Sequence, residues 1–164
     1  MHKPLERILY VEDETGTLTV AGVLLAFAAV FAVPLAKADD SLTPTVAKGV
    51  QVISVEQARS LVGRAPFFDA RRPLNFGKGH IKGAVALPYA QKSDRNERFD
   101  AAKDKLDMAR LPEDKSSPIV FYSEGPSGWK AYKSAVLAAR AGYSDVRWLR
   151  DGIAGWVAKG GDLE

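Results

Sequence analysis

The chain has 164 residues, which suits one domain with an extension, and its 46% hydrophobic and 9% aromatic residues are ordinary for a globular protein. Its 23 Lys and Arg against 20 Asp and Glu are scattered without a basic block, so we expect no nucleic-acid partner. The absence of cysteine and the wide separation of the two histidines, His2 and His80, exclude disulfides and thiolate or paired-histidine metal sites. We expect no metal and no cofactor.

The first predicted segment covers residues 1–38. Thr15 to Ala36 is an uncharged run of 22 residues, and the Ala36-Lys37-Ala38 that closes it resembles a signal-peptidase site. Such a run is also long enough to span a bilayer. Three interpretations stay open: a cleaved signal peptide, an uncleaved membrane anchor, or a buried helix. The first two predict an exported or periplasmic protein, or one attached to the inner membrane through this run.

The opening stretch Arg7 to Glu14 resembles the first strand and acidic pair of response-regulator receiver domains. The pattern ends after about fourteen residues and nothing downstream continues it. We therefore expect no receiver function.

The main domain is expected at residues 50–164, after a polar linker at 39–49. Val50 to Ile53 predicts a strand, and Ser54 with Gln57 forms a capping box that starts a helix ending at Gly63. Pro66 to Ala70 predicts a second buried strand, followed by a short turn or helix through Gly77.

The second half of the domain repeats the alternation of helix and strand. Within the charged stretch 91–112, the apolar residues Phe99, Ala102, Leu106 and Met108 predict a helix. Pro118 to Tyr122 predicts a buried strand, and a helix follows from Trp129 to a C-cap at Gly142, with Lys130, Lys133 and Arg140 off its apolar face. Asp145 to Leu149 predicts the last strand, and Asp151 opens a final helix. This alternation predicts an α/β fold with a mainly parallel sheet covered by helices on both faces.

Six residues join the central strand to its helix: Ser123, Glu124, Gly125, Pro126, Ser127 and Gly128. A loop of this kind directs backbone N–H groups and the positive end of the helix dipole at one point, which favours an anion or a thiolate nucleophile. Lys130, in the first turn of the helix, could add positive charge. Asp69 and Ser123 both lie at predicted strand ends, where such sheets carry their sites.

Three separated motifs carry a family resemblance. They are the Phe121 to Trp129 stretch, the Asp69-x-Arg71 pair with Gly79-His80-Ile81-Lys82-Gly83-Ala84, and Gly152 with Trp156. Together they resemble rhodanese-like sulfurtransferase domains, especially a form whose loop reads Phe-Tyr-Cys-Asn-Gly-Pro-x-Cys-Trp. The resemblance implies a three-layer sandwich and transfer of sulfur through a cysteine persulfide. It also implies that Asp69, Arg71 and His80 tie loops together beside the active site.

Both cysteine positions of that form are replaced here, by Ser123 and Gly128. A serine hydroxyl is far less acidic than a thiol and cannot form a persulfide. Glu124 places a carboxylate where a thiosulfate-like anion would bind.

Three hypotheses on function follow. The first is a non-catalytic binding or accessory module of the cell envelope, with a protein partner or a small anion as its ligand. The second is a thiosulfate-type sulfurtransferase, as in the family, in which Ser123 is an engineered or aberrant replacement. The third is a hydrolase that uses Ser123 as nucleophile, with His80 as its one ready general base.

Overall fold

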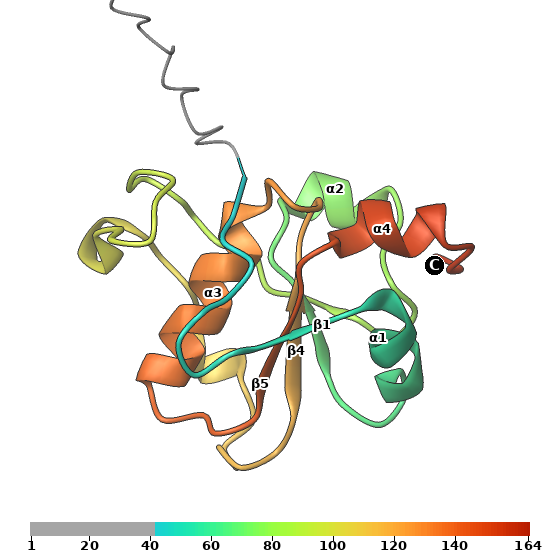
Figure 1. Ribbon diagram of the computed structural model, residues 1–164, viewed down its shortest axis with the longest axis horizontal. Coiled ribbons are helices and arrows are strands. Elements are labelled where there is room, and N and C mark those ends of the chain that lie inside the picture. The colour runs from blue at the N-terminus through green and yellow to red at the C-terminus, as the bar shows by residue number, and fades with distance from the viewer. Residues whose placement is uncertain (1–41) are drawn as a thin grey trace, which may run out of the picture. The chain divides into compact units, whose positions relative to one another are not determined.

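The computed structural model describes residues 42–164 (Figure 1). The predicted N-terminal apolar helix, the signal peptide or anchor at 1–38 and the receiver-like stretch lie outside these residues. Between residues 42 and 164, no helix is both long enough and apolar enough to cross a bilayer.

The described part of the chain is built on a five-stranded parallel sheet with the order β1-β5-β4-β2-β3. The strands are β1 (Gln51–Ile53), β2 (Phe67–Asp69), β3 (Val85–Ala86), β4 (Ile119–Tyr122) and β5 (Val146–Leu149). The helices are α1 (Val55–Leu61), α2 (Pro73–Gly77), α3 (Trp129–Arg140) and α4 (Gly152–Ala158). This arrangement confirms the predicted α/β fold.

Alternate residues of the central strands pack on opposite faces of the sheet, as expected for extended chain. Phe121 contributes to the core under α3, while Val120 and Tyr122 contribute to the core under α1 and α4. Because both faces are covered, every residue of β4 is buried, which explains why its sequence is a continuous apolar run. Figure 1 shows α3 on one side of the sheet and α1 and α4 on the other.

Local signals set two helix ends, the start of α1 and the end of α3. Ser54 and Gln57 form the predicted capping box, with hydrogen bonds of 3.3 Å from the Gln57 N–H to Ser54 Oγ and 2.8 Å from the Ser54 N–H to Gln57 Oε1. The α3 helix ends at Arg140, and Gly142 follows with φ +95°. That left-handed conformation favours glycine after a helix.

The helix predicted within 91–112 is wrong. The chain there forms only two short 3₁₀ turns, η1 (Ala101–Lys103) and η2 (Met108–Arg110), within an irregular segment. Phe99 is buried, but Asp104 accepts hydrogen bonds from the backbone N–H groups of Lys92 and Ser93 at 2.6 and 2.7 Å. These long-range bonds fold the segment back on itself and outweigh its helical periodicity.

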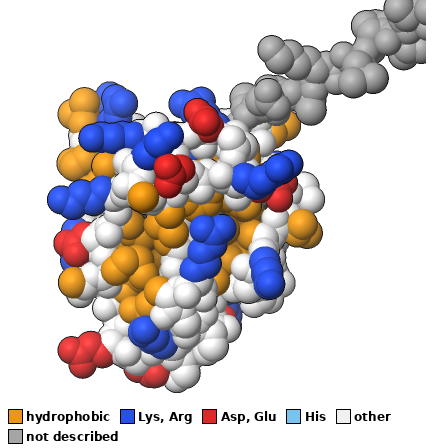
Figure 2. All heavy atoms as spheres, turned by 90° about the vertical axis from the view of Figure 1, so that its left-hand side faces the viewer, with side chains coloured by type: hydrophobic (Ala, Val, Ile, Leu, Met, Phe, Trp, Pro, Cys, Tyr) orange, Lys and Arg blue, Asp and Glu red, His pale blue; other side chains and the backbone are white. Residues whose placement is uncertain are grey.

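The outer side of α3 is largely apolar. Figure 2 shows hydrophobic side chains gathered over this face of the molecule, with Lys and Arg side chains among and around them. A hollow of about 540 Å³ lies there, lined in part by Val46, Tyr132, Val136 and Ala139.

Candidate functional site

Ser123 follows β4 directly and begins the loop that leads to α3. Its side chain is almost fully buried, with 1% of the residue exposed, and its hydroxyl donates a 3.0 Å hydrogen bond to the Gly128 carbonyl. This hydrogen bond joins the first residue of the loop to its last residue. By the family resemblance, this is the position of the nucleophile.

The backbone N–H groups of the loop divide into two sets. Those of Gly128 and Trp129 donate within the loop, to the carbonyls of Gly125 and Ser127 at 2.8 and 3.0 Å. Those of Glu124, Gly125 and Ser127 have no acceptor among residues 42–164. The second set leaves three donors for water or a ligand.

Two glycines allow the loop to close as it does. A Cβ atom at Gly128 would lie 2.1 Å from Ser123 Oγ and 2.7 Å from the Gly125 carbonyl oxygen. Gly152, at the start of α4, has φ +57°, and a Cβ there would lie 2.5 Å from the Ser123 carbonyl oxygen. The close approach of α4 allows the Ile153 and Ala154 N–H groups to donate to the Ser123 and Glu124 carbonyls at 2.9 and 3.0 Å.

Asp69 and Arg71 form a buried ion pair at the end of β2. Arg71 donates from Nε to Asp69 Oδ1 at 2.9 Å and from Nη2 to Oδ2 at 2.6 Å, and the same Nη2 donates to the Gly79 carbonyl at 2.7 Å. The pair thus joins the end of β2 to the segment that carries His80. Burial is the largest single influence and lowers the pKa of Arg71, but the hydrogen bond to Asp69 and the charges of Asp69 and Glu124 together outweigh it and raise the pKa overall.

His80 contacts α2 and the end of the described chain. Its ring stacks on Phe76 with centroids 3.7 Å apart, Nδ1 lies 3.2 Å from the Phe76 carbonyl oxygen, and Nε2 lies 3.5 Å from Glu164 Oε1. Both ring nitrogens therefore face groups other than Ser123. The structure does not bring Ser123 and His80 together as a nucleophile and its base.

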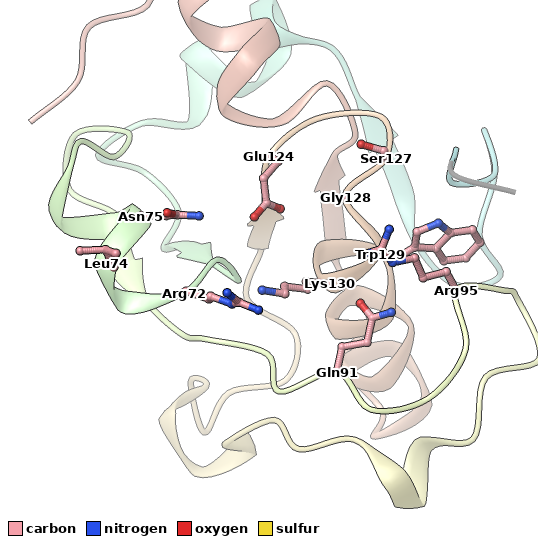
Figure 3. Close-up of a pocket in the computed structure, with 10 residues that line it drawn as sticks. All are labelled: Arg72, Leu74, Asn75, Gln91, Arg95, Glu124, Ser127, Gly128, Trp129 and Lys130. Carbon is pink, nitrogen blue, oxygen red and sulfur yellow. The ribbon is translucent and has the colours of Figure 1, made fainter. Parts of the chain in front are cut away.

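A pocket of about 390 Å³ opens beside the loop. Its lining residues come from α2 and its flank, the irregular segment, the loop and the start of α3: Arg72, Leu74, Asn75, Gln91, Arg95, Glu124, Ser127, Gly128, Trp129 and Lys130. In Figure 3 the side chains of Arg72, Lys130, Asn75, Gln91 and Glu124 point toward a common space, while Arg95 lies beside Trp129. Ser123 is not among the lining residues.

Charge in this pocket is mainly positive and unpaired. Among residues 42–164, the side chains of Arg72, Arg95 and Lys130 make no ion pair and no hydrogen bond, and the Glu124 carboxylate has neither. Three cations against one carboxylate give the pocket an excess positive charge. An anion is the ligand that such a wall favours.

A buried polar cluster holds one wall of the pocket in place. Lys133 Nζ, on α3, donates to Ser93 Oγ at 2.6 Å and to the Ser93 carbonyl at 3.2 Å, and lies 3.2 Å from Asp104 Oδ2. The Ser93 carbonyl also accepts a 3.4 Å hydrogen bond from Gln91 Nε2, which lines the pocket. Burial lowers the pKa of Lys133, and the hydrogen bond to Asp104 opposes this.

Sequence reasoning missed several of these residues. Helical spacing placed Lys133 off the apolar face of α3, yet its side chain is fully buried. Thr43 was assigned to a linker, yet it is 3% exposed and donates to the Pro126 carbonyl of the loop from its N–H at 2.8 Å and from Oγ1 at 2.6 Å. No local pattern marks either residue, because the partners of each are distant in sequence.

Comparison with known proteins places this geometry in a family. The family model described as the rhodanese-like domain matches residues 54–159. The thiosulfate:glutathione sulfurtransferase of Homo sapiens is 27% identical over 113 residues, which are 68% of this chain and 96% of that protein. The uncharacterized protein YibN of Escherichia coli K12 is 27% identical over 112 residues, covering 67% of this chain and 69% of YibN.

Solved structures agree. The crystal structure of the Alr3790 protein from Anabaena sp. aligns with a TM-score of 0.50 at 27% identity, covering 68% of this chain and 90% of that one. The BH2092 protein from Bacillus halodurans aligns with a TM-score of 0.51 at 19% identity, covering 70% and 76%, and shows the fold alone. The family model spans more than half of the chain, and the loop, the Asp69–Arg71 pair and the strands β2 to β5 lie within it: the chain belongs to the rhodanese-like domain family, and it is related to sulfurtransferases.

Proposed function

We propose that this chain is a rhodanese-like module that binds a small anion beside its loop and does not transfer sulfur. The observation that carries the proposal is Ser123 at the nucleophile position, buried and hydrogen-bonded to the Gly128 carbonyl. The pocket next to it supplies the binding function, because Arg72, Arg95 and Lys130 line it without ion-pair partners within residues 42–164.

The chemistry of sulfur transfer supports the first half of the proposal. The reaction needs a side chain that is anionic near neutral pH and can form a bond to sulfur. A thiol with an ordinary pKa of about 8.5 can be ionised by nearby N–H groups, whereas a serine hydroxyl cannot be brought into that range. The chain has no cysteine at any position, so no other residue can supply the thiolate.

A Ser123-dependent hydrolase is less well supported. Such an enzyme needs a general base within hydrogen-bond reach of the hydroxyl. The Ser123 hydroxyl instead donates to a backbone carbonyl, and the two ring nitrogens of His80 face Phe76 and Glu164.

A sulfur-transfer assay tests the loss of catalysis. Thiosulfate and 3-mercaptopyruvate would serve as donors and glutathione as acceptor, because the human relative is named a thiosulfate:glutathione sulfurtransferase. We expect no turnover above background for the native chain. Turnover by the native chain would overturn the proposal.

Two variants make the same assay sharper. Ser123→Cys places a thiol at the start of the loop, and we expect it to take up a persulfide that mass spectrometry detects. Gly128→Cys is the matched control, because its Cβ atom would collide with Ser123 Oγ and with the Gly125 carbonyl oxygen. Persulfide on Gly128→Cys alone would place the nucleophile site at the other end of the loop.

Anion binding has its own test. Calorimetric titration with sulfate and thiosulfate should detect binding to the native chain and weaker binding to an Arg72→Gln, Lys130→Gln double variant. Lys103→Gln, which removes an exposed cation that does not line the pocket, is the control.

We also propose that the module works in the cell envelope, exported or held at the membrane through Thr15 to Ala36. The support is the uncharged run and the small residues that close it. The first residue of the exported protein tests this: Asp39 indicates cleavage, and an intact Met1 in the membrane fraction indicates an anchor.

A further inference from the structure

The pocket beside the loop does not present a uniform positive surface. Arg72, Lys130 and Glu124 direct their charged groups toward the same space, and the carboxylate enters from the loop, opposite the two cations (Figure 3). None of the three side chains forms an ion pair among residues 42–164, although the Glu124 charge helps to raise the pKa of Arg71. A site built only for sulfate or thiosulfate would gain nothing from a carboxylate in this position, because like charges repel.

The amide side chains add a second feature. Asn75 and Gln91 also point into the space, and each amide can both donate and accept hydrogen bonds. One N–H of the Gln91 amide donates to the Ser93 carbonyl at 3.4 Å, and its other N–H and its oxygen have no partner within residues 42–164. Amides of this kind suit a ligand that has donors as well as acceptors.

The size of the pocket also favours an organic ligand over a single small anion. At about 390 Å³ the pocket falls within the usual range for organic ligands, roughly 300–1,000 Å³, and is larger than one tetrahedral anion requires. Arg95 lies at the Trp129 side of the pocket, apart from Arg72 and Lys130. A ligand with two acidic groups could therefore meet cations at two places.

From this arrangement we propose that the pocket binds a small amino acid that carries a second acidic group, and that Glu124 selects for its ammonium. The two acidic groups would pair with the cations Arg72, Lys130 and Arg95, and the ammonium would donate to the Glu124 carboxylate. This inference rests on the proposed anion-binding function and narrows it to one class of ligand.

The matched ligands for the test are glutamate and glutarate, which share two carboxylates on a five-carbon chain and differ by the ammonium. Isothermal titration of the native chain should give about two- to fivefold tighter binding of glutamate, since Glu124 is exposed and an exposed charge pair contributes only a factor of this size. Glu124→Gln should reverse the preference, weakening the binding of glutamate by about the same factor and strengthening the binding of glutarate.

Glu97→Gln is the control variant, because Glu97 is an exposed carboxylate that does not line this pocket. We expect it to bind both ligands as the native chain does. Thermal unfolding checks that both variants are folded, which we expect because the Glu124 side chain makes no hydrogen bond within the described residues.

Failure of this inference and failure of the proposed function give different results. If the native chain binds glutarate or sulfate, but Glu124→Gln changes the affinities for glutamate and glutarate by the same factor, the amino-acid inference is overturned and anion binding stands. If millimolar glutamate, glutarate and sulfate all fail to bind the native chain, both proposals are overturned.

Discussion

Two Asp-x-Arg pairs in this domain have the same spacing and nearly the same bonds, but different surroundings. Arg71 binds Asp69 through Nε and Nη2 at 2.9 and 2.6 Å, and Arg147 binds Asp145 through Nε and Nη2 at 2.8 Å each. The first pair has side-chain exposures of 8% for Arg71 and 0% for Asp69, against 24% and 32% for Arg147 and Asp145.

The position of each pair in the sheet explains the contrast. Asp69 is the last residue of β2, at the carboxyl ends of the parallel strands, where the loop 123–128 also begins. Arg71 there donates a further hydrogen bond to the Gly79 carbonyl. Asp145 precedes β5, at the amino ends of the parallel strands. The sequence pattern alone thus does not separate a residue that supports the site from one that covers a surface; burial and the third hydrogen-bond partner do.

The largest difference between the pairs should appear when each carboxylate is neutralised. Asp69→Asn leaves the Arg71 guanidinium buried opposite a neutral amide, so we expect a loss of about 3–5 kcal/mol in the free energy of unfolding. Asp145→Asn, the matched control, should lose less than about 1 kcal/mol, because water reaches Arg147. Urea unfolding of both variants checks this, and equal losses would contradict the role given to burial.

Breaking a second buried pair, Lys133 with Asp104, should cost a free energy of unfolding between the losses for Asp69→Asn and Asp145→Asn. Lys133→Met removes the ammonium but keeps an apolar chain of similar length, and Asp104 keeps hydrogen bonds from Lys92, Ser93 and Tyr89. The variant loses the three hydrogen bonds of the ammonium, but Asp104 and Ser93 keep other partners, so we expect a loss of about 1.5–3 kcal/mol in the free energy of unfolding, measured by urea unfolding. Lys159→Met, which removes the exposed cation paired with Glu56, is the control and should leave the unfolding midpoint unchanged. A Lys133→Met variant as stable as the native chain would show that the Lys133 ammonium does not help to hold the irregular segment.

Much of the fold could be predicted from local signals. The apolar run of β4, the capping box at Ser54 and the strand ends at Asp69 and Ser123 each depend on neighbours in sequence, and the structure contains all of them. The motifs around Asp69 and Ser123, with Gly152 and Trp156, also led to the correct family. These features are local, so periodicity and short motifs were enough.

The remainder depends on contacts between distant segments. The pocket draws Arg72, Gln91 and Lys130 from three parts of the chain, and no spacing rule brings them together. The helix predicted within 91–112 failed for the same reason, since Asp104 bonds to Lys92 and Ser93 rather than supporting a helical turn. Tertiary hydrogen bonds of this kind override helical periodicity.

The loss of stability at acid pH should differ between the native chain and an Asp104→Asn variant. Burial alone would raise the pKa of Asp104, but hydrogen bonds from Ser93, Lys92 and Tyr89 outweigh it and hold the pKa below its ordinary value. A depressed pKa means that the folded state binds fewer protons, so this stability is present above the unfolded pKa of about 4 and is lost as pH falls through the folded value.

In an Asp104→Asn variant that part of the pH dependence is absent. We expect the stability difference between the native chain and the variant to shrink steadily as urea unfolding is repeated from pH 5 to pH 2. A difference that stays constant over this range would mean that Asp104 titrates alike in the folded and unfolded chains.

The smallest expected effect concerns salt, and it returns to the two Asp-x-Arg pairs. The Debye length, over which salt screens charges, falls from about 10 Å at 0.1 M salt to about 3 Å at 1 M. Added salt therefore weakens exposed charge pairs much more than buried ones. The small loss caused by Asp145→Asn should therefore shrink further in 1 M NaCl, while the loss caused by Asp69→Asn should persist. Because salt also changes the stability of the native chain, the quantity to compare is each variant against the native chain at the same salt concentration. If both losses fell by the same fraction, solvent would reach Asp69 and Arg71 as readily as it reaches Asp145 and Arg147, and the buried pair could not act as a fixed link between β2 and the segment that carries His80.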